Sequence, residues 1–105
     1  MARFAVRVEL FGRAGEDDYE SLHGEMQDNG YYRVIESGKG EWYHLPTATY
    51  DHTSSSQSRS DVCDEVWKIA KSVWNDPGIL ITEVNGMVWQ GLRKASSQEV
   101  KAATA

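Results

Sequence analysis

The stretch Arg3-Phe4-Ala5-Val6-Arg7-Val8-Glu9-Leu10 decides the fold, because its hydrophobic and polar residues alternate without a break. Successive side chains of a β-strand point to opposite faces, so one face of this strand carries Phe4, Val6, Val8 and Leu10. The opposite face carries Arg3, Ala5, Arg7 and Glu9. Such alternation is typical of an antiparallel sheet with one face buried. We therefore expect a first strand over residues 3–11, in a sheet that is covered on one side only.

Two helices are expected to provide that cover. The first spans about residues 16–29, where Tyr19, Leu22 and Met26 form one hydrophobic stripe and Asn29-Gly30 is a stop signal. The second spans about residues 59–74 and begins at Ser58, which has the pattern of an N-cap. Its inner stripe consists of Val62, Val66, Ile69, Ala70 and Val73.

Four further strands are indicated. Residues 31–36 and 41–50 are joined by a Gly-containing connector, and Pro46 interrupts the second of them because proline cannot donate to a strand ladder. Residues 51–58 are polar and predict a solvated loop. Residues 79–84 are strongly hydrophobic, and Asn85-Gly86 predicts a tight hairpin to a short last strand over 87–92.

This order predicts an α+β fold of the ferredoxin-like type, βαββαβ, with a short extra C-terminal strand and two helices on one face of an antiparallel sheet. A chain of 105 residues has room for one such domain. We place it at residues 1–92. Residues 93–105 lack a hydrophobic anchor and are expected to form a disordered tail.

Composition narrows the location and the partners. The net charge of −5 argues against broad electrostatic attraction to nucleic acid, so any such contact must rest on where the arginines lie. No hydrophobic run is long enough to span a membrane, and the N-terminus does not resemble a signal peptide. Cys63 is the single cysteine, which suits a reducing compartment. We expect a cytoplasmic protein without a membrane partner.

The sequence indicates neither a metal nor a cofactor. His23, His44, His52 and Cys63 are scattered and lack the spacing of zinc ligands. No phosphate-binding glycine loop is present. Cys63 has acidic neighbours that oppose a thiolate, so we interpret it as a packing residue.

The open sheet face is the first place to look for function. Arg3 and Arg7 project from it, Arg33 of the second strand can join them, and Tyr31 and Tyr43 lie on neighbouring segments. Arginines with aromatic rings on an exposed sheet are a recurring way to hold single-stranded RNA. The alternative is that the three arginines pair across strands with Glu9, Glu36 and Glu41.

The four tryptophans favour a different interpretation. Trp67 and Trp74 lie off the hydrophobic stripe of the second helix, so at least one of them is a candidate for a poorly covered surface. Tryptophan is enriched at the centres of protein interfaces. The sequence therefore leaves a homodimer, or another protein partner, as an open alternative to intramolecular cover by the last strand or the tail.

Several segments resemble the GhoS antitoxins of type V toxin–antitoxin systems, a family of small bacterial proteins. The resemblance covers about residues 1–92. Its motifs are Met1-Ala2-Arg3-Phe4-Ala5-Val6-Arg7-Val8-Glu9-Leu10, then Asp18-Tyr19 with Leu22-His23 and Met26, then Trp42-Tyr43-His44-Leu45-Pro46-Thr47-Ala48 with Tyr50, and Thr82-Glu83 with Trp89 and Gly91-Leu92.

The resemblance implies a ferredoxin-like endoribonuclease that cleaves a toxin transcript. On this hypothesis Arg3, Arg7 and Arg33 contact phosphates and Tyr43 stacks on a base. His44 serves as acid or base near neutral pH. Glu9 is the nearest match to the acidic residue that related nuclease folds place at the end of the first strand. Two alternatives remain: a non-catalytic, phage- or plasmid-borne module that binds a protein, and a homodimer that buries the open sheet face.

Overall fold

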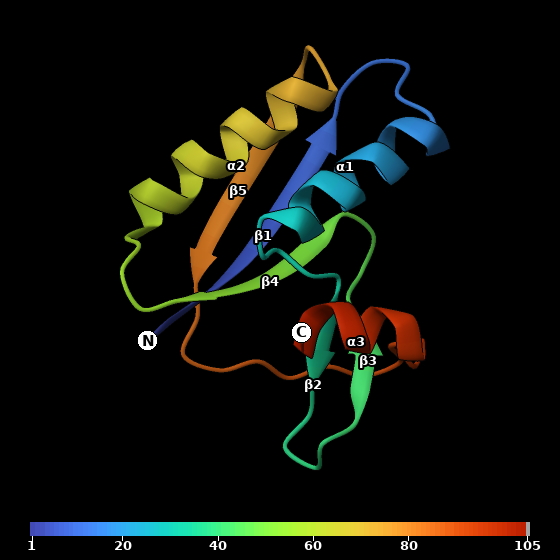
Figure 1. Cartoon of the computed structure of the whole chain (residues 1–105), viewed down its shortest axis with the longest axis vertical. Helices are drawn as coiled ribbons and strands as arrows, with labels where there is room; N and C mark the ends of the chain where they lie inside the picture. The colour runs from blue at the N-terminus through green and yellow to red at the C-terminus, as the bar shows by residue number, and fades with distance from the viewer. Residues whose placement is uncertain (105) are drawn as a thin grey trace.

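The computed structural model describes residues 1–104 and shows a small α+β protein with three helices and an antiparallel sheet (Figure 1). The main sheet has three strands in the order β4-β1-β5. Strand β1 spans Ala2–Leu10, β4 spans Thr49–Ser54 and β5 spans Pro77–Glu83. Strand β1 lies between the other two and pairs with a strand along each of its edges.

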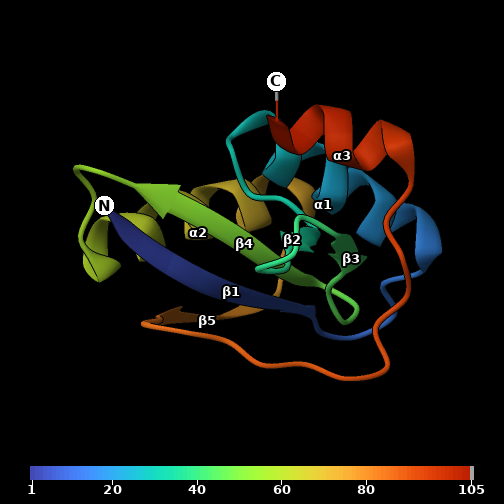
Figure 2. The ribbon, with the colours of Figure 1, turned by 90° about the horizontal axis from the view of Figure 1, so that it is seen from below.

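Helices α1 (Glu16–Asp28) and α2 (Arg59–Val73) lie on the same side of this sheet (Figure 2). The start of α2 is fixed by a reciprocal cap: Asp61 N donates to Ser58 Oγ at 3.1 Å, and Ser58 N donates to Asp61 Oδ2 at 2.9 Å. The two helices and the N-cap at Ser58 confirm the predictions made from the sequence.

The core lies between the two helices and one face of the sheet. Phe4, Val6, Val8 and Leu10 are all buried there, so the alternation of β1 predicts its buried face correctly. The helices and β4 contribute the remaining large members of the core, among them Leu22, Met26, Tyr50, Val62 and Val66.

A second, smaller sheet pairs β2 (Val34–Glu36) with β3 (Trp42–His44). Tyr32, which precedes β2, links it to the main sheet. Tyr32 N donates to Asp51 O at 3.0 Å, and Asp51 N donates to Tyr32 O at 2.7 Å. This is the one β-bridge between the two sheets within residues 1–104.

The expected strand over 41–50 is in fact two strands, β3 and β4, and β4 continues to Ser54 where a loop was expected. The chain turns between them: Thr49 N donates to Pro46 O at 3.0 Å, and Ala48 has a positive φ of 58°. Beyond the turn, Tyr50 and His52 alternate with more exposed neighbours and enter the core. The polar residues of β4 led to the prediction of a loop, although this segment is a strand with one buried face.

The C-terminal part also differs from the prediction. Residues 87–92 form no strand, and Asn85-Gly86 makes no hairpin; instead the chain crosses to the free edge of β3. There His44 N donates to Arg93 O at 2.7 Å, and Ala95 N donates to Trp42 O at 3.1 Å. The expected disordered tail contains helix α3 (Ser97–Thr104), which lies against the small sheet (Figures 1 and 2).

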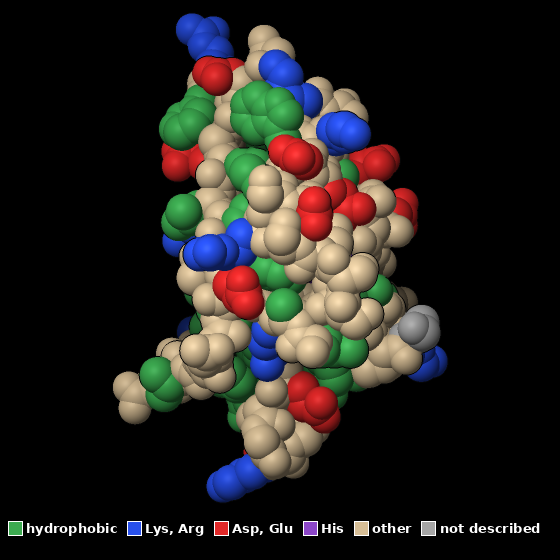
Figure 3. All heavy atoms as spheres, turned by 90° about the vertical axis from the view of Figure 1, so that its left-hand side faces the viewer, with side chains coloured by type: hydrophobic (Ala, Val, Ile, Leu, Met, Phe, Trp, Pro, Cys, Tyr) green, Lys and Arg blue, Asp and Glu red, His purple; other side chains and the backbone are tan. Residues whose placement is uncertain are grey.

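The second face of the main sheet has no helix over it. Arg7 and Glu9 are exposed there, and the side chain of Leu80 is 63% exposed. Figure 3 views the neighbouring side, formed by α2 and β5, where hydrophobic side chains lie exposed among acidic and basic ones. None of the helices in residues 1–104 combines the length and hydropathy that crossing a membrane requires.

Candidate functional site

The residues predicted to bind RNA do not form one group on the open face. Arg3 is held by Asp51, with Arg3 Nε at 2.8 Å from Oδ1 and Nη2 at 3.0 Å from Oδ2. These hydrogen bonds raise the pKa of Arg3, although its partial burial acts in the opposite direction. Arg3 therefore pairs with Asp51, and with none of the three glutamates considered from sequence.

Arg7 and Glu9 are the exposed charges of β1. They border a shallow hollow together with Phe11 and Leu80. His44 belongs to the small sheet and lines a different part of the molecule. The structure thus does not bring Glu9 and His44 together as an acid and base pair.

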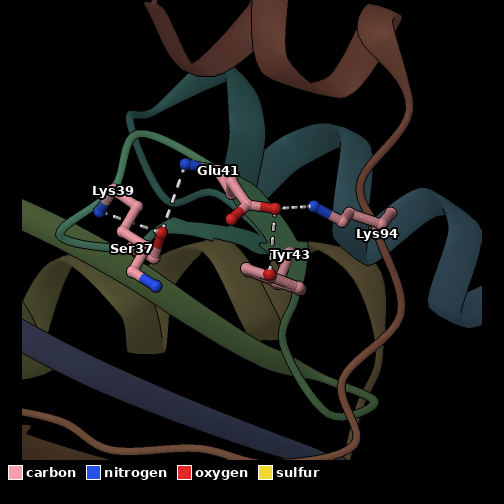
Figure 4. Close-up of polar contacts among 5 residues, drawn as sticks. All are labelled: Ser37, Lys39, Glu41, Tyr43 and Lys94. Atoms are coloured by element: carbon pink, nitrogen blue, oxygen red, sulfur yellow. Dashed lines mark hydrogen bonds and ion pairs between the residues drawn. The ribbon is translucent and has the colours of Figure 1, made fainter.

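Tyr43 is packed against the chain segment that follows β5 (Figure 4). Lys94 Nζ lies 4.7 Å from the centroid of its ring, and the ring of Trp89 lies 6.0 Å away. Lys94 also forms an ion pair with Glu41, whose hydrogen bond from Lys94 lowers the pKa of the Glu41 carboxyl. Because Lys94 covers the ring, Tyr43 is a poor platform for a base in this arrangement.

Arg33 lines a different feature, a pocket of about 270 Å³ between α1 and the small sheet. We call it the α1–β2 pocket. It is lined by Glu20, His23, Gly24 and Gln27 of α1, by Tyr32, Arg33 and Val34 at β2, and by Glu99 of α3. Three elements that are distant in sequence therefore meet around one polar hollow.

Arg33 supplies the cation of the α1–β2 pocket. Its Nε is buried and has no hydrogen-bond partner among residues 1–104. A guanidinium presents its N–H groups in a fixed planar fork that matches carboxylate and phosphate oxygens. A buried donor without a partner is costly, so a shift of the Arg33 side chain that presents Nε to an anionic ligand in the pocket would be favoured.

His23 lies beside Arg33 and is neutral at pH 7. Burial lowers the pKa of His23 from 6.5 to about 4, and the positive charge of Arg33 acts in the same direction. Its Nδ1 lies 2.6 Å from the hydroxyl oxygen of Tyr50, whose own pKa is raised by burial. When the hydroxyl donates to Nδ1, the other ring nitrogen of His23 carries the proton and can donate to a ligand.

His44 contacts the pocket through Glu99. Nε2 of His44 lies 2.6 Å from Glu99 Oε2, and both side chains are 28% exposed. Ser96 donates to the other carboxylate oxygen from its hydroxyl at 2.8 Å and from its backbone at 3.1 Å. Burial opposes ionisation of Glu99, but the hydrogen bonds from Ser96 and His44 outweigh it and lower the pKa of the carboxyl. The pair resembles the carboxylate–histidine arrangement that orients a catalytic imidazole.

The structure adds His23 and Glu99 to the site residues predicted from sequence. His23 gave no distinctive signal, because a lone histidine on an amphipathic helix is usually structural. Glu99 did have one: Ser96-Ser97-Gln98-Glu99 matches the Ser-x-x-Glu capping box, which marks a helix start. Within residues 1–104, no group of three or more His, Cys, Asp or Glu side chains is placed to hold a metal ion.

Compared with models of protein families and with curated protein sequences, the chain matches none of them.

Proposed function

We propose that the chain is an RNA-binding protein of the GhoS antitoxin type, and an endoribonuclease, that acts on a toxin transcript. The observation that carries this proposal is the α1–β2 pocket, in which the unpartnered Nε of Arg33 lies beside neutral His23 and the His44–Glu99 pair. The family part of the proposal rests on the sequence motifs alone.

A ferredoxin-like topology is part of the same proposal. The Tyr32–Asp51 bridge lies on the outer edge of β4, so the segment before β2 continues the sheet beyond β4. The resulting order, β5-β1-β4 followed by this segment, is compatible with the split βαβ arrangement of that fold. The small β2–β3 sheet then becomes an extension of the second strand.

The charge of the pocket suits a single nucleotide rather than a long polyanion. Arg33 and the free N–H of His23 offer donors to one phosphate, whereas Glu20 offers an acceptor to an amino group of a base. The pocket volume of about 270 Å³ lies just below the usual range of about 300–1,000 Å³ for ligand sites. The net charge of −5 provides no broad attraction, so binding must depend on this local contact.

In the proposed cleavage step His44 accepts the proton of a ribose 2′-hydroxyl, because Glu99 fixes the ring and stabilises the imidazolium. The 2′-oxygen then bonds to phosphorus and the bond to the 5′-oxygen breaks. The imidazolium returns its proton to that leaving oxygen. The products are a 2′,3′-cyclic phosphate and a 5′-hydroxyl, and Arg33 stabilises the charge that develops on the phosphate.

The test measures binding of short, fluorescently labelled single-stranded RNAs by anisotropy at several salt concentrations. Arg33→Gln should weaken binding and reduce the slope of log K against log[salt] by about 1. Arg59→Gln is the matched control, because Arg59 lies on α2 and its guanidinium is 3.7 Å from Glu83, away from the pocket. Salt-insensitive binding, or equal effects of both substitutions, would contradict the site.

Cleavage is tested separately with the same RNAs. His44→Gln should abolish the cyclic-phosphate product while leaving binding unchanged, because His44 contributes the proton transfer and Arg33 the phosphate contact. If the wild-type protein neither binds nor cleaves RNA, the protein-binding module and the homodimer remain as candidates. Trp67, with 44% of its surface exposed on α2, would then be the first residue to examine.

A further inference from the structure

Strand β5 has one free edge. The bonds Val84 N to Arg3 O, at 2.9 Å, and Phe11 N to Asp76 O, at 3.0 Å, show that residues 76 and 84 direct their backbone groups toward β1. The antiparallel register pairs Gly78, Leu80 and Thr82 with β1 in the same way. The N–H and C=O groups of the intervening residues, Ile79, Ile81 and Glu83, therefore point away from β1.

No segment within residues 1–104 covers that edge. None of the backbone hydrogen bonds outside the sheet and helices involves Ile79, Ile81 or Glu83. The chain leaves the end of β5 and runs toward the small sheet, away from the free edge (Figure 1). Helix α2 covers a face of β5 rather than its edge.

The free edge also lacks the usual protection against pairing. Natural edge strands carry lysine, inward-pointing charges, bulges or prolines that block another strand. In β5 these features are confined to the ends, with Pro77 at the start and Glu83 at the finish. The five residues between them, Gly-Ile-Leu-Ile-Thr, are uncharged, and Leu80 is 63% exposed on the open face.

We propose that β5 pairs along this edge with β5 of a second copy of the chain, antiparallel about a two-fold axis at Ile81. Ile81 then lies opposite Ile81 of the partner, and Ile79 lies opposite Glu83. Every outward N–H and C=O of the three edge residues finds a partner, which gives six backbone hydrogen bonds. Because the same edge of β5 is used in both copies, the contact is that of an isologous dimer.

Pro77 argues against one of the neighbouring registers. Moving the two strands by one step places Pro77 opposite Glu83, and because proline has no N–H, one carbonyl at each end loses its donor. The Ile81 register avoids proline and places no like charges opposite each other. It also brings the two exposed Leu80 side chains into diagonal contact across the axis on the open face.

This dimer differs from one that buries the open sheet face, and a matched pair of substitutions separates the two. Leu80 and Thr49 lie opposite Arg7 on its two sides, so they belong to one row of the same face. Leu80 is at the proposed interface, whereas Thr49 lies on β4, on the far side of β1. A lysine at either position adds the same charge to the same face.

Sedimentation velocity at several concentrations is the first measurement, with circular dichroism to verify folding. We expect a wild-type dimer, an increase in its Kd of about tenfold or more for Leu80→Lys, and no comparable change for Thr49→Lys. A monomeric wild-type protein overturns the proposal. Equal loss in both variants indicates face-to-face association and overturns it, as does no loss in either.

Crosslinking tests the register directly in a Cys63→Ser background. Directly opposed residues of a hydrogen-bonded pair have Cα atoms about 5.5 Å apart, within reach of a disulfide. Ile81→Cys should therefore form a covalent dimer under mild oxidation. Ile79→Cys is the control. In this register Ile79 lies four residues along the strand from Ile79 of the second copy, so their Cα atoms are about 14 Å apart. Absence of the first crosslink, or equal yields from both, overturns the register.

Discussion

His23→Gln should remove part of the pH dependence of stability, because His23 is held neutral in the fold. Its pKa is about 4 in the folded protein and about 6.5 in an unfolded chain. Protonation therefore favours the unfolded state between these values. The stabilising contribution is complete above about pH 6.5 and is lost as the pH falls toward 4.

The size of the effect follows from the same two values. The interval from 6.5 to about 4 corresponds to at most about 3 kcal/mol. His23 borders a solvent-accessible pocket, so screening reduces the expected contribution to about 1–2 kcal/mol. At pH 7 the variant should be less stable than the wild type by about 1 kcal/mol, because the hydrogen bond between His23 and Tyr50 is lost.

The assay is urea unfolding of both proteins at pH 7, 6, 5 and 4.5. The difference in the free energy of unfolding between the two proteins should shrink, and disappear or reverse, as the pH is lowered. Carboxylates titrate equally in both proteins, so their contribution to this difference cancels. NMR titration of the His23 ring gives the pKa itself, and Arg33→Gln should raise it because a neighbouring positive charge is removed. A constant stability difference, or a ring pKa near 6.5, would refute the reasoning.

Two further predictions concern packing and the C-terminal helix. Met26→Ala should lower the free energy of unfolding by about 2–5 kcal/mol in urea melts, because Met26 is fully buried between α1 and the sheet; the exposed Gln27→Ala should change it by less than about 0.5 kcal/mol. Ser96→Ala should loosen α3 without global unfolding, because Ser96 caps the helix and holds Glu99. Hydrogen exchange would show faster exchange in residues 97–104 only, and unchanged protection there would contradict the cap.

Local patterns predicted the elements that pack on the core. The alternation of β1 and the hydrophobic stripe of α2 both arise because one face of each element is buried. That burial produces a periodic spacing of hydrophobic residues, which can be recognised in the sequence. The split of residues 41–50 was harder to predict, because β4 buries Tyr50 and His52 between polar neighbours. His52 is held in the core by polar contacts at both ring nitrogens: Nδ1 lies 2.8 Å from Gly30 O, and Nε2 lies 2.7 Å from Gln57 Oε1.

The candidate site was less predictable, since it depends on contacts between distant segments. Arg33 was named from sequence for the open sheet face, which does not contain the α1–β2 pocket, and His44 was named as an acid or base. The pocket needs α3 to bring Glu99 to His44, and α3 lies where hydrophobic periodicity is weak. The Asn85-Gly86 signal predicted a hairpin because it is local, whereas pairing of Lys94 with Tyr43 depends on the position of the whole small sheet.

The Tyr32–Asp51 bridge has a mechanical consequence for the α1–β2 pocket. Helix α1 belongs to the main core, whereas β2 and α3 lie beside it, joined to the main sheet by the two Tyr32–Asp51 backbone hydrogen bonds and by contacts of β2 with β4. The walls of the pocket therefore stand on two bodies that meet at a seam. A ligand that contacts both Arg33 and α1 would restrain the motion of the small sheet relative to the main core. Part of its binding free energy would then be spent on ordering the small sheet, which would lower the observed affinity.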